Sequence, residues 1–333
     1  MSGARLRWPA IRHRQRGVAL IIALILVALA TILATKLTFD GFLERRRTIG
    51  VLAAEQALHF GMGAEALAAY ALAEDLKNNQ TTLAAPWAQP TQPLPITPED
   101  DPEGEPIGTL QGELEDMQSR FNLNNLAHII TTNGKTEQDP VPLEQFQRLL
   151  IKVGLESKWA GQARDWIDDD ENPGSPDGAE DQIYTSQTPP YHTGNWPMVS
   201  ASELMNLPGF GADRYRKIAP FVTALPDASV RINLCTAPVQ VLESLADLNG
   251  DFGSPETLAN ARKSGCFPDL KTFTQVVGPK TLAQLNGRFE DHSQYFRLTT
   301  HISLGTTEFT LYSLLLRGPS GKTTPLLRSF GTP

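Results

Sequence analysis

The clearest pattern in the chain is an apolar run near its start. Residues 18–35 read VALIIALILVALATILAT and carry no charge. A helix of this length and composition is just long enough to cross a membrane. Helix-favouring residues continue after the run, and no proline occurs between Pro9 and Pro86. The pattern therefore predicts one helix from Val18 to about Lys77, roughly 90 Å long at about 1.5 Å per residue.

The second half of this predicted helix, residues 41–79, is amphipathic. Its large apolar side chains are interpreted as the face that packs on the rest of the protein. They are Leu52, Leu58, Met62, Leu67 and Tyr70. The helix is expected to end near Asn78 and Asn79.

Beyond the helix, the pattern alternates between loops and short elements. Residues 86–106 contain seven prolines, which predicts an exposed loop without regular structure. Phe121 and Leu123 alternate with polar residues and predict a short strand that enters a turn. Helical spacing then predicts four helices, at residues 143–153, 160–167, 200–206 and 212–225.

The last third of the chain combines strands and one helix. Strand character at residues 230–234 precedes a predicted helix over residues 238–247. Alternating runs at residues 295–303 and 308–317 flank a turn at 304–307 and predict a hairpin. This order predicts an α+β fold. The long N-terminal helix packs on an antiparallel sheet, and a large α-helical domain is inserted into the sheet domain.

Charge is distributed unevenly along the chain. Residues 1–17 hold five arginines and no acid, so the remainder has a net charge of −13, although the whole chain has −8. An acidic body repels nucleic acid and attracts cations. The hydrophobic content of 41% and the charged content of 20% are those of a folded protein.

The junction between the basic and apolar segments resembles a type IV prepilin leader. Arg14, Gln15, Arg16 and Gly17 directly precede Val18. In such leaders a membrane peptidase cuts after the glycine, so the resemblance implies cleavage between Gly17 and Val18. The alternative is an uncleaved signal anchor. Lys36, Arg45, Arg46 and Arg47 follow the span, so the positive-inside rule alone does not fix the orientation.

The strongest candidate chemistry is an acidic stretch in a Gly- and Pro-rich loop. It reads WIDDDENPG over residues 166–174 and GAED over residues 178–181. Crowded carboxylates repel one another, and a hard cation with oxygen ligands removes that repulsion; Ca²⁺ suits flexible loops better than Mg²⁺. We expect the ligands to be Asp168, Asp170, Glu180 and Asp181. The alternative is a solvated acidic loop without a metal.

The acidic loop does not match the EF-hand template throughout. Asp168, Asp170 and Asn172 fit its opening positions. Pro173 stands where the template has glycine, and Ala179 stands where it has the final glutamate. The sequence therefore predicts a calcium loop of another kind.

Several motifs together resemble the K-type minor pseudopilins of the type II secretion system. They are RFNLNNL at residues 120–126, WIDDDENP at 166–173, GAED at 178–181, PPY at 189–191 and SEL at 202–204. Ile22 adds to the resemblance. Most pilins have glutamate at the fifth mature position, and the K-type subunit at the filament tip lacks it. An unpaired carboxylate in lipid would be costly.

The resemblance implies a function and partners. It implies a non-enzymatic subunit at the tip of the pseudopilus, which initiates assembly and limits length during export of folded proteins. It also implies calcium binding in the helical domain, and association with the I- and J-type minor pseudopilins, other pseudopilins, the prepilin peptidase and the inner membrane. The body would lie in the periplasm, and no nucleic acid is expected as a partner.

We divide the chain accordingly into six segments. These are a leader (1–17), a membrane-spanning part (18–40), the periplasmic half of the helix (41–79), a Pro-rich loop with the first strands (80–125), the inserted α-domain (126–228) and a C-terminal α/β part (229–333). Cys235 and Cys266 are the two cysteines. We expect a disulfide between them in an oxidising compartment. The alternative is two buried free thiols.

Two other classes of function remain to be tested. Residues 204–218, LMNLPGFGADRYRKI, resemble a helix-hairpin-helix motif, in which backbone N–H groups and nearby cations contact phosphate. A membrane-anchored DNA-binding protein is therefore the alternative function, although DNA-binding modules are usually basic. An enzyme is disfavoured, because the six histidines are scattered outside any known catalytic motif.

Overall fold

The computed structural model describes residues 16–98, 101, 103–132, 134–174, 177–246, 250–285 and 287–332. It divides into a first unit that ends at Gln56 and a second that begins at Ala57 and continues to the C-terminus. We refer to the second unit as the body. Residues 1–15 of the predicted leader lie outside the described residues.

Helix α1, Arg16–Asp75, confirms the predicted long helix to within two residues at each end. Among the described residues it is the one helix long and apolar enough to cross a membrane. In the first unit its apolar side chains are exposed, Ile22 among them. These residues find no partner within their own unit, as a lipid-facing segment requires. The first unit is therefore a candidate single membrane anchor.

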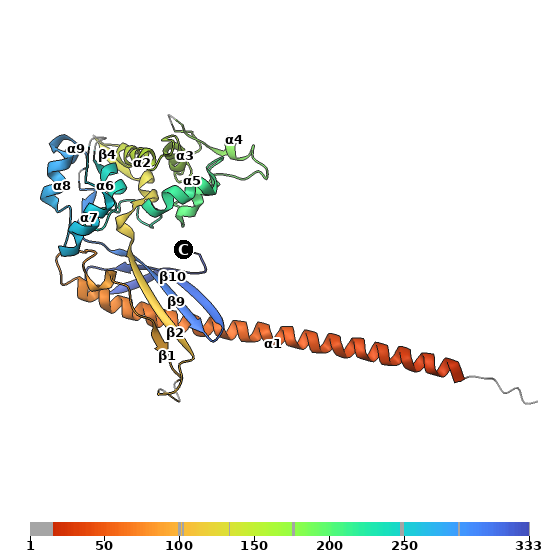
Figure 1. Ribbon diagram of the computed structural model, residues 1–333. Coiled ribbons are helices and arrows are strands. Elements are labelled where there is room, and N and C mark those ends of the chain that lie inside the picture. The colour runs from red at the N-terminus through yellow and green to blue at the C-terminus, as the bar shows by residue number, and fades with distance from the viewer. Residues whose placement is uncertain are drawn as a thin grey trace, which may run out of the picture. The chain divides into compact units, whose positions relative to one another are not determined.

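The body is built on a five-stranded antiparallel sheet (Figure 1). Its order is β1 (Leu94–Ile96), β2 (Gly108–Asp116), β9 (Tyr295–Leu304), β10 (Thr307–Arg317) and β11 (Thr323–Phe330). Strands β9 and β10 form the predicted hairpin, with Thr307 opposite Leu304. The prediction that residues 86–106 lack regular structure was wrong at β1. Pro95 is tolerated there because β1 is an edge strand.

The C-terminal turns of α1 cover one face of this sheet (Figure 1). The residues buried against the strands are small: Ala57, Gly61, Ala64 and Ala68, followed by Leu72. A Cβ at Gly61 would clash with the side chain of Leu311 on β10. The predicted packing face was wrong, because four of its five large residues are exposed. These are Leu52, Met62, Leu67 and Tyr70.

Residues 117–294 lie between β2 and β9 and form the helical part of the body. This segment contains the proposed 126–228 domain and extends beyond it at both ends. Its helices are α2 (Pro140–Lys152), α3 (Trp159–Asp165), α4 (Asp181–Tyr184), α5 (Gly211–Ile218), α6 (Val239–Leu245), α7 (Pro255–Ala261), α8 (Leu270–Val277) and α9 (Pro279–Leu285). Short strands complete it: β3 (Phe121–Asn122), β4 (Ile129–Thr132), β5 (Lys135–Gln138), β6 (Val222–Thr223), β7 (Ile232–Asn233) and β8 (Phe289–Glu290).

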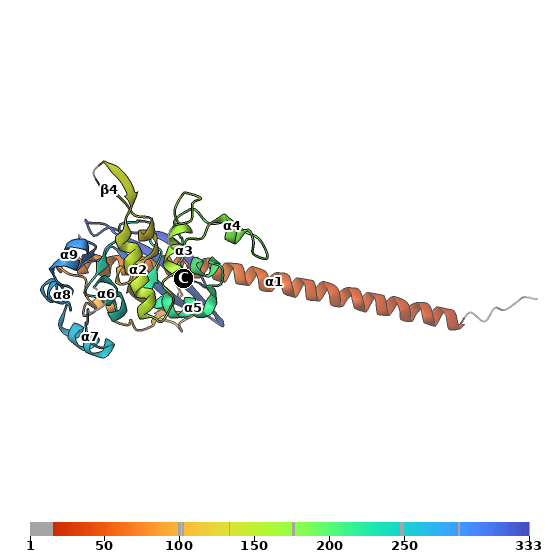
Figure 2. The same cartoon turned by 90° about the horizontal axis from the view of Figure 1, so that it is seen from above.

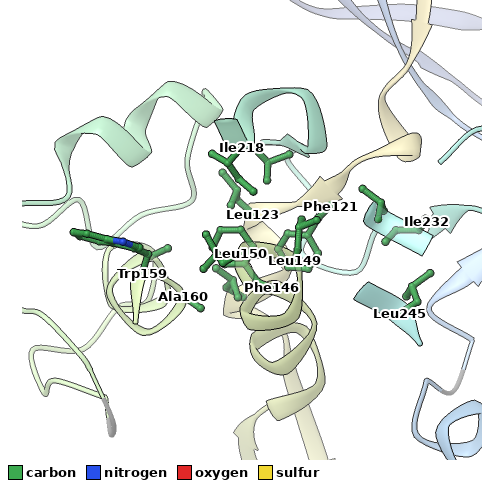
Figure 3. Close-up of a cluster of buried hydrophobic side chains, with 14 of the residues drawn as sticks. Phe121, Leu123, Phe146, Leu149, Leu150, Trp159, Ala160, Ile218, Ile232 and Leu245 are labelled. Carbon is green, nitrogen blue, oxygen red and sulfur yellow. The ribbon is translucent and has the colours of Figure 1, made fainter. Parts of the chain in front are cut away.

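One hydrophobic core holds the helical part together (Figure 3). Phe146, Leu149 and Leu150 of α2 lie at its centre and are fully buried. Phe121 stacks on Phe146 with ring centroids 5.1 Å apart. The predicted helices near 143–153 and 160–167 are confirmed as α2 and α3. The β4–β5 hairpin projects away from these helices (Figure 2).

Two predicted helices differ in detail. Residues 201–206 form a 3₁₀ helix with a capping box between Ser200 and Glu203. The helix predicted over 212–225 ends at Ile218, because the chain turns at Pro220 and then forms β6. Strand β6 pairs in parallel with β3.

A buried polar network connects the sheet to the helical part. The Asp116 carboxylate, at the end of β2, accepts hydrogen bonds from the side chains of Asn233, Thr236 and Ser293. Burial raises the pKa of Asp116 above its ordinary value, while these donors act in the opposite direction. A fully satisfied network of this kind fixes the relative position of the segments that contribute to it.

The structure joins Cys235 and Cys266 by a disulfide. Cys235 is buried in the turn before α6, and Cys266 follows α7. The bond closes a ring whose ends are 31 residues apart in sequence.

Replacing both cysteines by alanine should lower the free energy of unfolding by about 3–4 kcal/mol, because the open chain gains entropy mainly in the unfolded state. Chemical denaturation of the two proteins measures the loss. Alkylation of both cysteines without reductant, detected by mass spectrometry, would contradict the bond itself.

Candidate metal centre

The acidic loop begins at the last residue of α3, Asp165, which is fully buried. One of its carboxylate oxygens, Oδ2, accepts hydrogen bonds from the backbone N–H groups of Gly174 and Ala179, both at 2.9 Å. The described part of the loop therefore folds back around this carboxylate. A Cβ at Gly178 would clash with Asp165 and with the backbone of Gly174. Position 178 therefore requires glycine, because the Asp165 carboxylate and the Gly174 backbone leave no space for a side chain there.

Four carboxylate oxygens near this loop are buried and have no hydrogen-bond partner among the described residues. They are Oδ1 of Asp165, Oδ1 of Asp168, and Oε1 and Oε2 of Glu180. The other oxygen of Asp168 accepts a hydrogen bond of 2.8 Å from Gln138 Nε2 at the end of β5. Unsatisfied buried carboxylate oxygens are costly. Their gathering in one loop indicates that a positive group is needed there.

The electrostatics of the loop agree with this interpretation. Burial, assisted by the neighbouring carboxylates of Asp165 and Asp170, raises the pKa of Asp168 to about 6. Burial and the surrounding acids, Asp165 first among them, raise the pKa of Glu180 to about 7. Burial also raises the pKa of Asp165. Near neutral pH, the simultaneous ionisation of these carboxyl groups is therefore unfavourable unless a cation is bound.

The donor set consists of carboxylate oxygens, which hard cations such as Ca²⁺ prefer. Arg164 Nε lies 3.8 Å from Asp165 Oδ1 and gives partial compensation. Across the described ranges, no three Asp, Glu, His or Cys side chains are grouped closely enough to hold a metal ion. To hold a hard cation, the carboxylates of the described loop would have to lie closer together than they do in this structure.

The four expected ligands do not behave alike. Asp168 and Glu180 both contribute unpaired buried oxygens. Asp170 is exposed and accepts a hydrogen bond of 2.7 Å from the Asn172 backbone N–H. The carboxylate of Asp181 is engaged elsewhere, with the Thr193 backbone N–H and hydroxyl and with His192. These hydrogen bonds, that of His192 first, lower the pKa of Asp181 to about 2.

Sequence reasoning missed Asp165. It lies three residues before Asp168 on the last turn of α3, between Arg164 and Trp166. A buried acid must be paired or must bind a cation. The burial of Asp165 is seen only in the structure, because its neighbours in the sequence include Arg164 and other polar residues.

Stability in the presence of a chelator should depend on pH through Asp168 and Glu180. Their folded-state pKa values lie above those of the unfolded chain, so their stabilising contribution is complete below about pH 4 and is lost as the pH rises through about 6–7. At pH 7.5 the double variant Asp168→Asn/Glu180→Gln should melt about 2–4 °C above the wild type. The difference should shrink at pH 5. Circular dichroism melting measures the difference between the two proteins at each pH. A double variant whose advantage in melting temperature over the wild type is smaller at pH 7.5 than at pH 5 would contradict the assignment.

The predicted processing residues lie at the start of α1. Gly17 and Val18 are its second and third residues, and Ile22 follows one helical turn later. The structure describes this segment as continuous helix.

The helix-hairpin-helix segment is folded as a turn between the 3₁₀ helix 201–206 and α5, with Gly209 and Gly211 at positive φ. Arg214 donates hydrogen bonds to the carbonyls of Gly209 and Phe210 and stacks on Trp159. Arg216 pairs with Asp213. Both arginines are thus engaged within their own hairpin, and this geometry gives no support to phosphate recognition.

Comparisons with known proteins agree on one family. The family model described as type II secretion system (T2SS), protein K, matches residues 119–227. The chain is 34% identical to the type II secretion system protein K of Pseudomonas aeruginosa, covering 96% of this chain and 94% of the relative. It is 32% identical to the protein of the same name from Aeromonas hydrophila, covering 96% and 98% of the two chains.

A solved structure is similar to the fold. The chain matches, with a TM-score of 0.73 and 28% identity, a chain from the crystal structure of the GspK–GspI–GspJ complex of the enterotoxigenic Escherichia coli type 2 secretion system. The match covers 86% of this chain and all of the other. The long N-terminal helix, the antiparallel sheet and the helical part are thus features of a known fold, as predicted.

Proposed function

The chain belongs to the family of type II secretion system protein K, and we propose that it acts at the tip of the pseudopilus. There it would initiate assembly and limit filament length during the export of folded proteins across the outer membrane. The observation that carries this proposal is the helical part inserted between β2 and β9, residues 117–294. So large an addition to a pilin-type subunit fits only where no further subunit has to be stacked above it.

The proposed location follows from α1. Its first half is exposed and apolar, and would cross the inner membrane once before assembly and enter the filament core afterwards. The body would lie in the periplasm, where the Cys235–Cys266 disulfide is stable. Ile22 supports the tip position, since a subunit with no neighbour ahead of it has no N-terminal amine for a glutamate to neutralise.

We propose that the acidic loop holds Ca²⁺ through Asp165, Asp168 and Glu180, with Asp170 at its exposed side. The four unpaired buried oxygens of the first three residues support this set. Asp181 is left out, because Thr193 and His192 already occupy its carboxylate. When bound, the ion supplies the positive charge that the loop lacks. Its role would be to fix the loop on α3 and Trp166, whose indole donates to Glu203.

The proposed partners are the I- and J-type minor pseudopilins, other pseudopilins and the prepilin peptidase. The similar solved structure is that of a complex of GspK with GspI and GspJ. No nucleic-acid or catalytic role is proposed for this chain, because its relatives are secretion-system components.

The tip position can be tested in cells that overproduce the major pseudopilin, so that pseudopili extend from the surface. An epitope fused after Pro333 should appear once per filament, at its outer end. The same epitope on the major pseudopilin should label the whole length. An epitope on this chain that is distributed along the filament would refute the tip position.

Replacing Gly17 by alanine should block removal of the leader, because the peptidase reads the residue before the cut. The unprocessed form keeps 17 residues that the wild type loses, and a denaturing gel of membranes separates the two. Ala4→Gly is the matched control and should be processed normally. Normal processing of the Gly17→Ala protein would show that this is not a prepilin leader.

A further inference from the structure

One hydrogen bond joins the acidic loop to the β4–β5 hairpin. Gln138, the last residue of β5, donates from Nε2 to Oδ2 of Asp168 at 2.8 Å. Among the described hairpin residues 129–131 and 135–138, this is the one side-chain hydrogen bond to another part of the body. The hairpin otherwise projects away from the helices (Figure 2). Its side-chain anchor is therefore an expected calcium ligand.

The backbone that carries Gln138 is fixed on both sides. Gln138 itself is paired with β4 across the hairpin. The next residue, Asp139, is only 2% exposed and caps α2, because its Oδ1 accepts a hydrogen bond of 3.0 Å from a backbone N–H of that helix. Its other oxygen is paired with Arg288 and with His128. The donor at position 138 is thus held on well-anchored structure.

The bond engages one oxygen of Asp168 and not the other. Oδ1 is buried and has no hydrogen-bond partner among the described residues. The backbone N–H of Asp168 donates to a carbonyl of α3 at 3.0 Å, so the residue is held at its backbone and at Oδ2. Gln138 is a neutral donor and therefore orients the carboxylate without neutralising its charge. Asp181 differs, because His192 and Thr193 engage both of its oxygens.

The charges around Asp168 leave this carboxylate suited to a cation. Asp165 and Asp170 repel its charge, and Arg164 attracts it. The carboxylates of the loop would have to come closer together around an ion. A ligand that is already fixed on regular structure loses little freedom when the ion binds, so its fixation increases the affinity. Gln138 provides this fixation for Asp168.

We propose that Gln138 is a positioning residue of the calcium site and that, through it, bound calcium anchors the β4–β5 hairpin to the body. The inference rests on the calcium site proposed above. Gln138 holds Asp168 by Oδ2, which leaves Oδ1 for the ion. Outer-shell hydrogen bonds of this kind contribute a factor of about 10–100 to metal affinity. Because coupling between two events is reciprocal, the ion strengthens the Gln138–Asp168 bond by the same factor.

The first measurement is the dissociation constant of the full chain in detergent for CaCl₂, by isothermal titration calorimetry after calcium has been removed with a chelator. Gln138→Met keeps the length of the side chain but cannot donate, and it should weaken binding about tenfold. Gln138→Asn is one methylene too short to reach Asp168 and should show a similar loss. Thr136→Met is the control. It alters an exposed residue on the same face of β5, and it should leave the dissociation constant unchanged.

The second measurement is hydrogen–deuterium exchange of the backbone amides with and without saturating CaCl₂. In the wild type, calcium should slow exchange in peptides that cover β5 as well as in peptides that cover residues 165–174, because the ion stabilises both against local opening. In the Gln138→Met protein, calcium should still slow exchange in the acidic loop but no longer in β5. A purely structural role of Gln138 would not remove the calcium dependence from β5 alone.

The outcomes separate this inference from the calcium site itself. Melting in chelator sets a temperature at which every variant is folded, and all affinities are compared there. If the wild type does not bind calcium, the site and the inference are both wrong. The site stands and the role of Gln138 is wrong if the wild type binds calcium and both Gln138 variants bind within about twofold of it. The anchoring of the hairpin is wrong if calcium slows exchange in the loop of the wild type but not in β5.

Discussion

Calcium is expected to raise the melting temperature of the protein by about 5–10 °C, and Glu180→Gln is expected to abolish that rise. A ligand present at a hundred times its dissociation constant stabilises the folded state by about 2.7 kcal/mol. For a domain of this size each kcal/mol corresponds to about 2–4 °C. Both carboxylate oxygens of Glu180 are buried and unpaired, so the substitution removes charge without breaking a hydrogen bond seen in the structure.

The design separates loss of the metal from loss of the fold. In chelator, the Glu180→Gln protein should be at least as stable as the wild type at pH 7.5, because one of several repelling charges is gone. Asp181→Asn is the matched control: it is the adjacent acid, but its carboxylate is held by Thr193 and His192. It should retain the calcium-dependent shift. If the wild type shows no shift in millimolar calcium, the acidic loop is a solvated surface and the proposed site is wrong.

Replacing Arg317 by methionine should cost about 3–5 kcal/mol of unfolding free energy, the usual effect of breaking a buried ion pair from one side. Arg317 is only 2% exposed. Its guanidinium donates to Asp75, to the carbonyl of Leu72 at the end of α1, to Thr81 and to the carbonyl of Ser293. Methionine fills similar space but leaves these acceptors, and above all the Asp75 carboxylate, without their donor.

The measurement is urea unfolding of the full chain in detergent, followed by tryptophan fluorescence. Arg231→Met is the control, because that side chain is 57% exposed and its ion pair with Glu290 is 3.8 Å long. It should change the stability by less than about 0.5 kcal/mol. A loss below about 1 kcal/mol for Arg317→Met would mean that water replaces the arginine, and that the apolar contacts of α1 and its Glu65 bonds to Ser313 and Arg328 suffice to hold it to the sheet.

The sequence predicts the fold class and the hairpin well because each depends on a long, regular pattern. The packing face of α1 was predicted wrongly, because most of its buried positions carry alanine or glycine, which contribute little to a hydrophobic periodicity. The larger residues Met62, Leu67 and Tyr70 are exposed. Close contact with Leu311, not hydrophobicity, selects Gly61. Such a choice depends on the opposite strand and is invisible from the helix alone.

The candidate metal centre was likewise only partly predictable from the sequence. Composition identified the loop and two of its important acids, Asp168 and Glu180. It could not separate Asp181 from them, because that distinction depends on hydrogen bonds with His192 and Thr193, eleven and twelve residues away. Strand β11 was also missed, because the pattern of TTPLLRSF is interrupted by Pro325 and by a bulge between β10 and β11.

The pairing of β2 with β9 has a consequence for how the protein reaches its native state. Asp116 lies opposite Phe296 in this ladder, so everything from 117 to 294 must be synthesised before the two strands can meet. Closing so long an open chain is entropically expensive and slows folding. The intervening segment has its own core. Once that core has formed, the two ends of the segment lie close together, and pairing β2 with β9 then costs little further chain entropy. We therefore expect the helices to fold first and the sheet to close last, with β2 among the last strands to gain its partner.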